Sequence, residues 1–275
     1  MNTGMTLVIG GNGKTGRRVV ERLKARNLPV RVGSRSGTPS FDWEQPQTWA
    51  NALRDISAVY VTYAPDLAAP GAADAIRKFT ALAKQGGVER VVLLSGRGEP
   101  EAQLCEQIVR ESGIDWTILR ASWFAQNFSE NYFLDGILAG ELVLPAGAVG
   151  EPFVDIDDIA DAAVAALTES GHSGQLYEMT GPRLLTFAEA VGEIARETKR
   201  EIRYVQVRVE DYAATLEGAQ LPPEVVQLVT YLFSEVLDGR NASVADGVSR
   251  ALGRAPRDFR DYVRDAAATG VWNQR

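Results

Sequence analysis

The sequence predicts an α/β fold, a doubly wound parallel sheet followed by a smaller and mostly helical C-terminal region. Through the first half of the chain, apolar runs of strand length alternate with segments of helical periodicity. A glycine-rich turn directly follows the first apolar run. After residue 122 the alternation gives way to aromatic clusters and short elements separated by glycine and proline. Alternating strands and helices form a parallel sheet with helices on both faces.

The strands expected in the first half are short and apolar, and amphipathic segments lie between them. The expected strands are 6–9, 30–32, 58–62, 91–94 and 117–119. The expected helices are 13–26, 72–84, 102–111 and 156–167, each with apolar residues on one face. We expect a further strand, at 175–179, to return to the sheet.

We expect two domains with an interleaved boundary. Residues 1–150 contain the sheet, and residues 151–275 form mostly a substrate-binding cap, apart from the returning strand. The cap segments are 186–199, 202–207, 209–217, 222–237 and 257–268. Aromatic residues gather between 123 and 133, where we expect a binding surface to begin.

The composition favours a globular chain whose partner is a small molecule. Of the 275 residues, 45% are hydrophobic and 24% are charged, which supplies a core and argues against disorder. The net charge is −7 and the sequence has no basic run, so nucleic acid is not an expected partner. Arginine far outnumbers lysine, a codon signature of GC-rich bacterial genomes.

The counts of cysteine and histidine restrict the chemistry further. The single cysteine, Cys105, cannot form an internal disulfide, and we expect it to pack inward on its helix. The single histidine, His172, excludes a histidine-rich metal site and lies in a polar segment that we interpret as a surface loop. No metal is expected. The sequence has no secretory signal and no apolar run of about 18 residues, so we expect a cytoplasmic protein that does not bind membranes. The sequence leaves the oligomeric state open and is compatible with a monomer.

The turn after the first strand has the spacing of a dinucleotide-binding loop of the Rossmann type. In TLVIGGNGKTGRRVV, Gly10 permits a tight turn, Gly13 lets a pyrophosphate approach the backbone, and Gly16 allows close packing of the helix. The N–H groups and the dipole of the first helical turn attract the anion. The alternative is a tight turn without a ligand. The loop residues assigned to the cofactor are Gly10, Gly11, Asn12, Gly13, Lys14, Thr15 and Gly16.

The end of the second strand favours NADPH over NADH. An NAD enzyme of this design carries an acidic residue there to bind the ribose hydroxyl groups, whereas this strand ends in GSRS. Arg35 can pair with a 2′-phosphate, Ser34 and Ser36 can donate hydrogen bonds, and Lys14 lies in the preceding loop. An exposed surface arginine is the alternative for Arg35. Asp42, a little further on, either flanks the adenine ring or forms an ordinary surface turn.

Several motifs together resemble those of a known family. They are GGNGKTG, VGSRSG, ISAVYVTYAPD, VERVVLLSG, SGIDWTILRASWFAQNF and PFVDIDDIADAA. With these motifs the chain resembles the atypical short-chain dehydrogenases of the NmrA-like group. Within that group it is most similar to the ergot alkaloid reductases of the agroclavine and festuclavine dehydrogenase type. The resemblance extends over roughly residues 5–265 and implies a Rossmann domain that binds NADPH.

The resemblance also implies roles for individual residues. It places Tyr63, Ala64 and Pro65 along the cofactor channel. Ser95 would face the nicotinamide, where its hydroxyl donates to the reacting heteroatom; a serine that only bonds the backbone is the alternative. Arg97 and Glu99 follow, either beside the pocket or as a surface pair. The residues that would line the substrate are Trp123, Phe124, Asn127 and Phe128, although each ring can instead belong to the core.

One feature of the family is missing. Short-chain dehydrogenases usually carry a Tyr-x-x-x-Lys pair whose tyrosine supplies the proton, and no tyrosine of this chain has lysine four residues later. Gly98 and Ala102 stand where the pair would be. Three reactions avoid the missing donor: reduction of an iminium, of a ketone hydrogen-bonded by its own phenol, or of a ketone through water ordered by Ser95.

The leading hypothesis is an NADPH-dependent ketoreductase that acts on a large polycyclic secondary metabolite of the aromatic polyketide type. The residues alone leave ketone and iminium open; the bacterial codon signature favours the ketone, because GC-rich bacteria commonly make phenolic polyketides. A non-catalytic redox sensor that binds NADP and a reductase of quinones are two further hypotheses.

Overall fold

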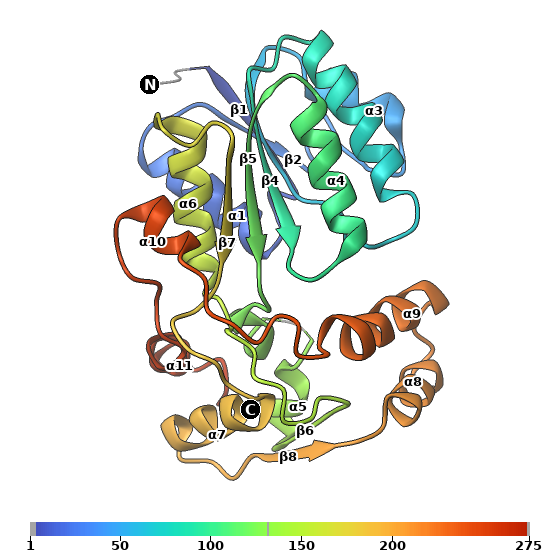
Figure 1. Cartoon of the computed structure of the whole chain (residues 1–275), viewed down its shortest axis with the longest axis vertical. Coiled ribbons are helices and arrows are strands. Elements are labelled where there is room, and N and C mark those ends of the chain that lie inside the picture. Colours follow the sequence, from blue (N-terminus) through green and yellow to red (C-terminus); the bar gives the residue numbers. More distant parts are fainter. Residues whose placement is uncertain (1–3, 131, 274–275) are drawn as a thin grey trace. The chain divides into compact units, whose positions relative to one another are not determined.

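Six parallel strands form the sheet of the first of two structural units (Figure 1), in the order β2-β1-β3-β4-β5-β7. The strands are β1 (Met5–Ile9), β2 (Val30–Gly33), β3 (Ile56–Val61), β4 (Arg90–Gly96), β5 (Asp115–Ala121) and β7 (Gln175–Met179). A computed structural model describes residues 4–130 and 132–273 of the chain. The five predicted strands and the returning strand at 175–179 are all confirmed, as is the doubly wound α/β fold.

Helices cover both faces of this sheet. In Figure 1, α3 (Ala72–Gln85) and α4 (Pro100–Glu111) lie on one face, and α1 (Lys14–Ala25) and α6 (Ile156–Thr168) lie on the other. The central strands are runs of Val, Ile and Leu that are buried, as expected for strands covered on both sides. Shorter helices complete the unit: η1 (Pro46–Thr48), α2 (Trp49–Ala52) and α10 (Gly247–Leu252).

The first unit ends earlier than residue 150, the boundary expected from the sequence. It comprises the chain up to Ala121, then Ile156–Met179 and Asp246–Ala255. Ion pairs explain why the later segments belong to it. Arg22 of α1 contacts Asp157 and Asp161 of α6 at 2.7 and 2.6 Å. Arg254 contacts Asp161 at 2.6 Å from the segment after α10. The hydrophobic periodicity of a sequence does not reveal ion pairs between helices, so periodicity alone does not predict this boundary.

The second unit consists of Ser122–Asp155, Thr180–Ala245 and the chain from Pro256 onwards. Its two parallel strands, β6 (Glu141–Leu144) and β8 (Arg203–Gln206), pair with each other. The helices are α5 (Leu134–Ala139), α7 (Phe187–Thr198), α8 (Val209–Gly218), α9 (Pro223–Tyr231) and α11 (Phe259–Ala268). Two short irregular helices complete it, η2 (Ala125–Phe128) and the π-helical η3 (Leu232–Val236). A capping box of Thr186 and Glu189 starts α7.

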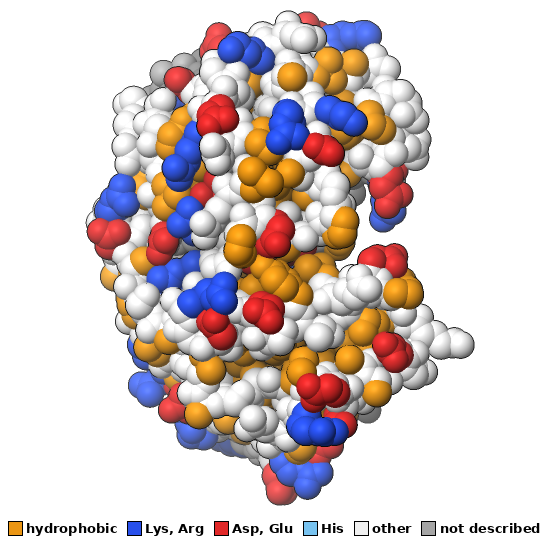
Figure 2. Space-filling model, turned by 45° about the vertical axis from the view of Figure 1, so that its right-hand side comes forward, with side chains coloured by type: hydrophobic (Ala, Val, Ile, Leu, Met, Phe, Trp, Pro, Cys, Tyr) orange, Lys and Arg blue, Asp and Glu red, His pale blue; other side chains and the backbone are white. Residues whose placement is uncertain are grey.

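The surface drawn in Figure 2 carries basic and acidic side chains interspersed with one another and with apolar ones. This mixture accords with a chain that has 29 basic and 36 acidic residues without a run of either sign. Within the described residues, every helix is too short or too polar to cross a lipid bilayer.

Candidate functional site

The topology of the first unit points to one edge of its sheet. β1 pairs with β2 on one side and with β3 on the other, so the winding of the chain reverses between β1 and β3. Ligands of open parallel sheets bind outside the carboxyl ends of the strands at such a reversal. The segments that leave the sheet there are the glycine-rich turn after β1 and residues 62–66 after β3.

The glycine-rich turn leaves its backbone open to an anion. Gly10 has φ of +67°, a conformation that favours glycine. A Cβ on Gly16 would lie 2.2 Å from the carbonyl oxygen of Gly10, so the helix packs against the turn more closely than any side chain allows. Gly13 is the N-cap of α1, is exposed and has no side chain with which to cap the helix. These features fit the pyrophosphate of a dinucleotide.

The remaining residues of the turn differ in exposure. Asn12 is exposed and Lys14 is half-buried, so both side chains are accessible to a ligand. Gly11 is buried, and a Cβ on it would lie 2.8 Å from Val32 Cγ1. The side chain of Thr15 is buried, which leaves its backbone N–H as the group that can meet a phosphate.

The segment after β2 presents an unengaged guanidinium. Arg35 is exposed, and among the described residues it has neither a hydrogen bond nor an ion pair. Ser34 and Ser36 stand on either side with their hydroxyl oxygens 3.5 Å apart. Asp42 is engaged locally instead: its carboxylate accepts from the backbone N–H of Glu44 at 3.1 Å and from the Gln45 side chain at 3.1 Å. These contacts fit an ordinary surface turn at Asp42, the second of the two alternatives given above for this residue.

The segment after β3 begins with an aromatic contact. The Tyr63 ring lies 4.9 Å from the ring of Trp43, whose Nε1 donates to the backbone oxygen of Thr62 at 2.9 Å. Burial raises the pKa of Tyr63. Ala64 and Pro65 follow, are exposed and are joined by a cis peptide bond. The three residues expected along the cofactor channel therefore lie at the carboxyl edge of the sheet.

Ser95 belongs to a buried polar network rather than to an open surface. It is 4% exposed, and its Oγ donates to Glu106 Oε1 of α4 at 2.7 Å. Arg120 of β5 donates to both oxygens of Glu106, at 2.8 and 2.5 Å. Hydrogen bonding to Glu106 raises the pKa of Arg120, so its guanidinium stays charged. In this arrangement the hydroxyl proton of Ser95 is directed at Glu106, whereas the role expected from the sequence directs it at a substrate.

The network continues along the edge of the sheet to Arg97. Arg120 Nη1 donates to Glu178 Oε1 of β7 at 3.1 Å, and Arg97 Nε donates to Glu178 Oε2 at 3.2 Å. Arg97 is 9% exposed and Glu99 is 6% exposed. The interpretation of these two residues as a surface pair is therefore wrong, because the turn after β4 folds both side chains inward.

Glu99 has an unusual environment, which the sequence alone did not indicate. Burial, then the charges of Asp66 and Glu101, raise its pKa to about 9. Asp66 lies in the segment after β3, and its charge acts on Glu99 from there. The two carboxyl groups are 33 residues apart in the sequence and meet because β3 and β4 are neighbours in the sheet. Only the strand order brings them together.

The aromatic residues expected around a substrate lie in the second unit and divide into two groups. Trp123 and Phe124 are half-buried, so parts of both rings are accessible. Phe128 is 0% exposed, and its ring packs on Phe133 and Phe153 at 5.2 and 5.5 Å. Phe128 thus belongs to the core and does not line a substrate. Asn127 is also buried, with its N–H donating to the Phe124 oxygen at 3.1 Å.

Cys105 and His172 are both buried. The inward packing of Cys105 is confirmed, and burial raises the pKa of its thiol to about 11. The surface position predicted for His172 is wrong: it is 8% exposed, and its Nδ1 lies 2.9 Å from the Tyr177 hydroxyl. Its backbone oxygen accepts from Thr117 Oγ1 at 2.7 Å, so the polar loop is folded onto the start of β5. No cluster of metal-ligating side chains occurs in the described part of the chain.

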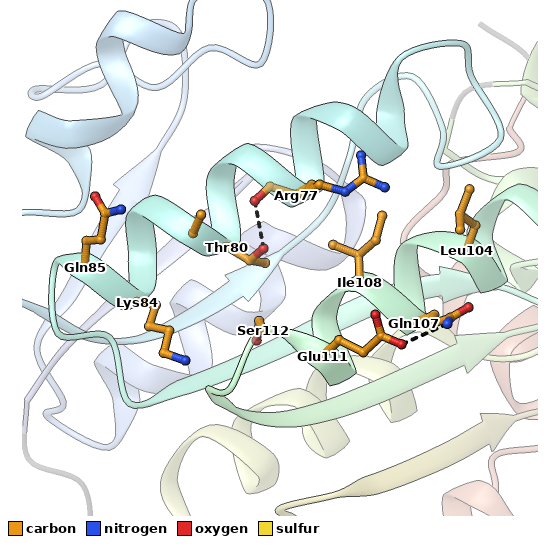
Figure 3. A pocket seen from close by; sticks show the side chains of 10 residues that line it. Arg77, Thr80, Lys84, Gln85, Leu104, Gln107, Ile108, Glu111 and Ser112 are labelled. Carbon is orange, nitrogen blue, oxygen red and sulfur yellow. Dashed lines mark hydrogen bonds between the residues drawn. The ribbon is translucent and has the colours of Figure 1, made fainter.

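A separate groove of about 600 Å³ runs between α3 and α4 (Figure 3). Arg77, Lys84, Leu104, Ile108 and Glu111 are among its lining residues. Figure 3 shows them projecting from the two helices on the surface of the unit. Its lining contains none of the residues assigned to the cofactor or the substrate.

Comparison with known proteins decides what the glycine-rich unit is. Residues 10–170 match the family described as NAD(P)H-binding, a span that includes the glycine-rich turn and the carboxyl ends of β2 to β5. The chain belongs to this family. The open backbone of the turn and the cradle at Gly16 fit the dinucleotide that the family binds. It is an NAD(P)H-dependent oxidoreductase, as its relatives are named.

Three known proteins show how far the likeness extends. The oxidoreductase is 32% identical to agroclavine dehydrogenase of Claviceps fusiformis, over 98% of this chain and 99% of that one. It is also 32% identical to (4-alkanoyl-5-oxo-2,5-dihydrofuran-3-yl)methyl phosphate reductase of Streptomyces griseus, over 96% and 98% of the chains. The crystal structure of NmrA, a negative transcriptional regulator, aligns with a TM-score of 0.72 at 16% identity over 98% of both chains. The resemblance to the ergot alkaloid reductases is confirmed, and the likeness to NmrA is one of fold.

Proposed function

We propose that this oxidoreductase uses NADPH to reduce the ketone carbonyl of a large polycyclic secondary metabolite in the cytoplasm. The relatives do not identify the substrate, because two proteins equally similar to this chain are named for an alkaloid and for a phosphorylated furanone. The proposal therefore depends on the residues of this chain. The observation that carries it is the unengaged Arg35 beside the dinucleotide turn, in a chain without the Tyr-x-x-x-Lys pair.

The residues that would hold the cofactor are the glycine-rich turn and the segment after β2. The turn offers N–H groups and the positive end of the α1 dipole to the pyrophosphate. Arg35 offers a planar guanidinium to a 2′-phosphate, and Ser34 and Ser36 add hydroxyl donors. When bound, reduced nicotinamide supplies two electrons and a hydrogen to an electrophilic carbon. The tasks left to the protein are to orient that carbon, exclude water and provide a proton.

The buried network on the carboxyl edge gives the site a rigid wall. Glu106 is fully paired by Ser95 and Arg120, and Glu178 is paired by Arg120 and Arg97. Fully satisfied buried networks fix side-chain positions. We assign Ser95 to positioning: its hydroxyl orients Glu106, and direct contact with a substrate requires that bond to break. Trp123 and Phe124 remain the proposed apolar contacts for a flat substrate.

The test is an assay of NADPH consumption with the purified protein. The probes are a polycyclic aryl ketone with a neighbouring phenol, a cyclic iminium salt and a quinone, each followed by the loss of NADPH absorbance and by product analysis. Turnover of the ketone with formation of the alcohol supports the proposal. Turnover confined to the quinone contradicts it. Binding of NADP⁺ and NADPH without consumption of NADPH with any probe contradicts it as well and supports the redox sensor.

Reduction of an iminium is the second candidate. Agroclavine dehydrogenase, 32% identical to this chain, is named for an alkaloid. An iminium becomes a neutral amine when it accepts hydride, so it requires no proton donor, which suits a chain without the tyrosine and lysine pair. In the same NADPH assay, turnover of the iminium salt without turnover of the ketone identifies this function.

A further inference from the structure

Two carboxyl groups meet at the carboxyl edge of the sheet in the first unit. Glu99 comes from the turn after β4, and Asp66 comes from the segment after β3. The negative charge of Asp66 acts on Glu99, and because two neighbouring carboxylates repel each other, it favours the protonated form of Glu99. Asp66 is held by the backbone N–H of Ala68, which donates to its Oδ1 at 2.8 Å. Glu99 itself is buried, 6% exposed, and burial disfavours the charged form of a carboxyl group.

The geometry of Glu99 keeps its carboxyl group in place. A Cβ on Gly96 would lie 2.1 Å from Glu99 Oε1 and 2.3 Å from its carboxyl carbon. The carboxyl group thus occupies the space that a side chain at the last residue of β4 would fill. Glu99 is the N-cap residue of α4, yet its side chain accepts no bond from the N–H groups of that helix. Such a bond would favour the ionised form, so its absence from the described contacts agrees with a neutral group.

One oxygen of this carboxyl group is unengaged. Glu99 Oε2 is buried and finds no hydrogen-bond partner among the described residues. A buried carboxylate oxygen without a donor is costly, whereas a protonated oxygen is a donor ready for an acceptor. The charged groups that act on Glu99 are Asp66 from the segment after β3 and Glu101 from the first turn of α4. Both are acids. Arg97, two residues earlier, donates to Glu178 of β7.

We propose that Glu99 is the general acid of this reductase and takes the place of the missing tyrosine. This inference rests on the proposed function, the reduction of a ketone with NADPH. As the carbonyl carbon gains its new C–H bond at the expense of the nicotinamide C–H bond, the O–H bond of Glu99 breaks and an O–H bond forms on the substrate oxygen, directly or through one water molecule. NADPH becomes NADP⁺ and the ketone becomes the alcohol. Glu99 is left as a carboxylate and regains its proton from solvent.

In this scheme Asp66 is a positioning residue. Its negative charge keeps Glu99 protonated at neutral pH and drives reprotonation after each turnover. Burial and Asp66 together hold the pKa of Glu99 at about 9, so the donor is present at pH 7 and is lost as the pH rises through that value. The proton donor is thus built from two segments that follow neighbouring strands, where a short-chain dehydrogenase uses a pair on one helix.

The kinetic test compares a ketone with an iminium of the same size. The probes are 1-tetralone, which carries no phenol to donate its own proton, and N-methyl-3,4-dihydroisoquinolinium, which needs no proton. In Glu99→Gln we expect ketone turnover to fall by about 100-fold or more, with iminium turnover and the Kd of NADPH unchanged. Glu111→Gln, an exposed glutamate at the other end of α4, is the matched control and leaves both reactions unchanged. Equal losses with both probes, or undiminished ketone turnover, overturn the proposal.

The pH dependence separates Asp66 from a merely structural role. Ketone turnover of the wild-type protein is expected to decline with a midpoint near pH 9, and iminium turnover is expected to lack this decline. Asp66→Asn removes the neighbouring charge and shifts the decline to lower pH, because the pKa of Glu99 falls. An unshifted decline in Asp66→Asn overturns the positioning role.

A measurement without cofactor or substrate tests the protonation state itself. Carbon NMR of protein labelled at glutamate carboxyl groups follows each group with pH, and Glu99→Gln identifies the Glu99 signal. We expect that signal to titrate near pH 9 in the wild type and lower in Asp66→Asn, with Glu111→Gln unchanged. A Glu99 that is already ionised at pH 7 overturns the proposal even if the protein reduces ketones. A neutral Glu99 in a protein that reduces neither probe overturns the proposed function and, with it, the catalytic role.

Discussion

At the scale of the single residue, Arg35 is the side chain that we propose to select NADPH over NADH. Its guanidinium is exposed, lies between two serines and makes no hydrogen bond or ion pair with the described residues. An arginine that stabilises the fold would be paired, as Arg22 is with Asp157 and Asp161. A free guanidinium at the end of β2 is instead available to a phosphate on the ribose.

We therefore expect Arg35→Ala to weaken NADPH binding and leave NADH binding nearly unchanged. A hydrogen bond to a charged group contributes about 1.5–3 kcal/mol, which corresponds to a rise of roughly 10- to 100-fold in the Kd of NADPH. Titration calorimetry with both coenzymes measures this. Arg54→Ala removes another exposed arginine and is the control. Equal losses for NADPH and NADH would show that Arg35 does not bind the phosphate.

Ser95 is predicted to affect stability more than catalysis. In Ser95→Ala, Glu106 loses one donor at 2.7 Å but keeps Arg120, so the free energy of unfolding should fall by about 1 kcal/mol. We expect ketone turnover to fall by less than about tenfold and the Kd of NADPH to stay constant, as measured by denaturant unfolding and steady-state kinetics. A loss as large as that expected for Glu99→Gln would instead place the Ser95 hydroxyl at the reacting atom.

At the scale of the element, the sequence predicts what periodicity and turn chemistry encode. Short apolar runs mark all six strands of the sheet, and the glycine spacing marks the turn between β1 and α1. These signals are local, since each depends on residues that are neighbours in the chain. The pairing of Asp66 with Glu99 is not local. It depends on the order of strands β3 and β4, and no pattern within either segment reveals it.

Burial is the second property that local patterns leave undecided. The rings between 123 and 133 have the same composition whether they line a ligand or a core, and the structure gives Phe128 to the core and leaves Trp123 half-buried. His172 lies among polar residues, yet its hydrogen bonds to Tyr177 and Thr117 fold it inward. Both outcomes depend on segments that are distant in the sequence or on the folding of a loop.

The junction of β1 and α1 yields a prediction for the element as a whole. A Cβ at Gly16 would lie 2.2 Å from the carbonyl oxygen of Gly10, so Gly16→Ala must push the helix away from the turn. We expect the free energy of unfolding to fall by about 1–3 kcal/mol and dinucleotide binding to weaken for NADPH and NADH alike. Circular dichroism during denaturation and calorimetry measure the two effects. Gly218→Ala is the control, because a Cβ there meets no atom within 4 Å. Unchanged binding in Gly16→Ala would contradict the role of this turn.

At the scale of the whole molecule, the chain enters the first unit three times. The stretch up to Ala121 supplies five strands, Ile156–Met179 adds α6 and β7, and Asp246–Ala255 adds α10. A Cβ on Gly247 would lie 2.2 Å from the backbone oxygen of Glu178, so α10 packs directly on β7. The late return of the chain therefore completes the same unit that binds the dinucleotide.

Arg254 joins this last segment to α6 through ion pairs, and its replacement tests how much these pairs stabilise the first unit. Its guanidinium contacts Asp158, which is 0% exposed, at 2.7 Å and Asp161 at 2.6 Å. Removing one partner of a buried ion pair is strongly destabilising, but Arg254 is 39% exposed, which lowers the effect. We expect Arg254→Ala to lower the free energy of unfolding by about 2 kcal/mol in urea denaturation. Arg208→Ala breaks an exposed pair with Asp211 and is the control, expected to leave the free energy of unfolding nearly unchanged because water screens exposed ion pairs. If the two variants are equally stable, the pairs to α6 do not hold the returning segment, and the direct packing of α10 on β7 is sufficient.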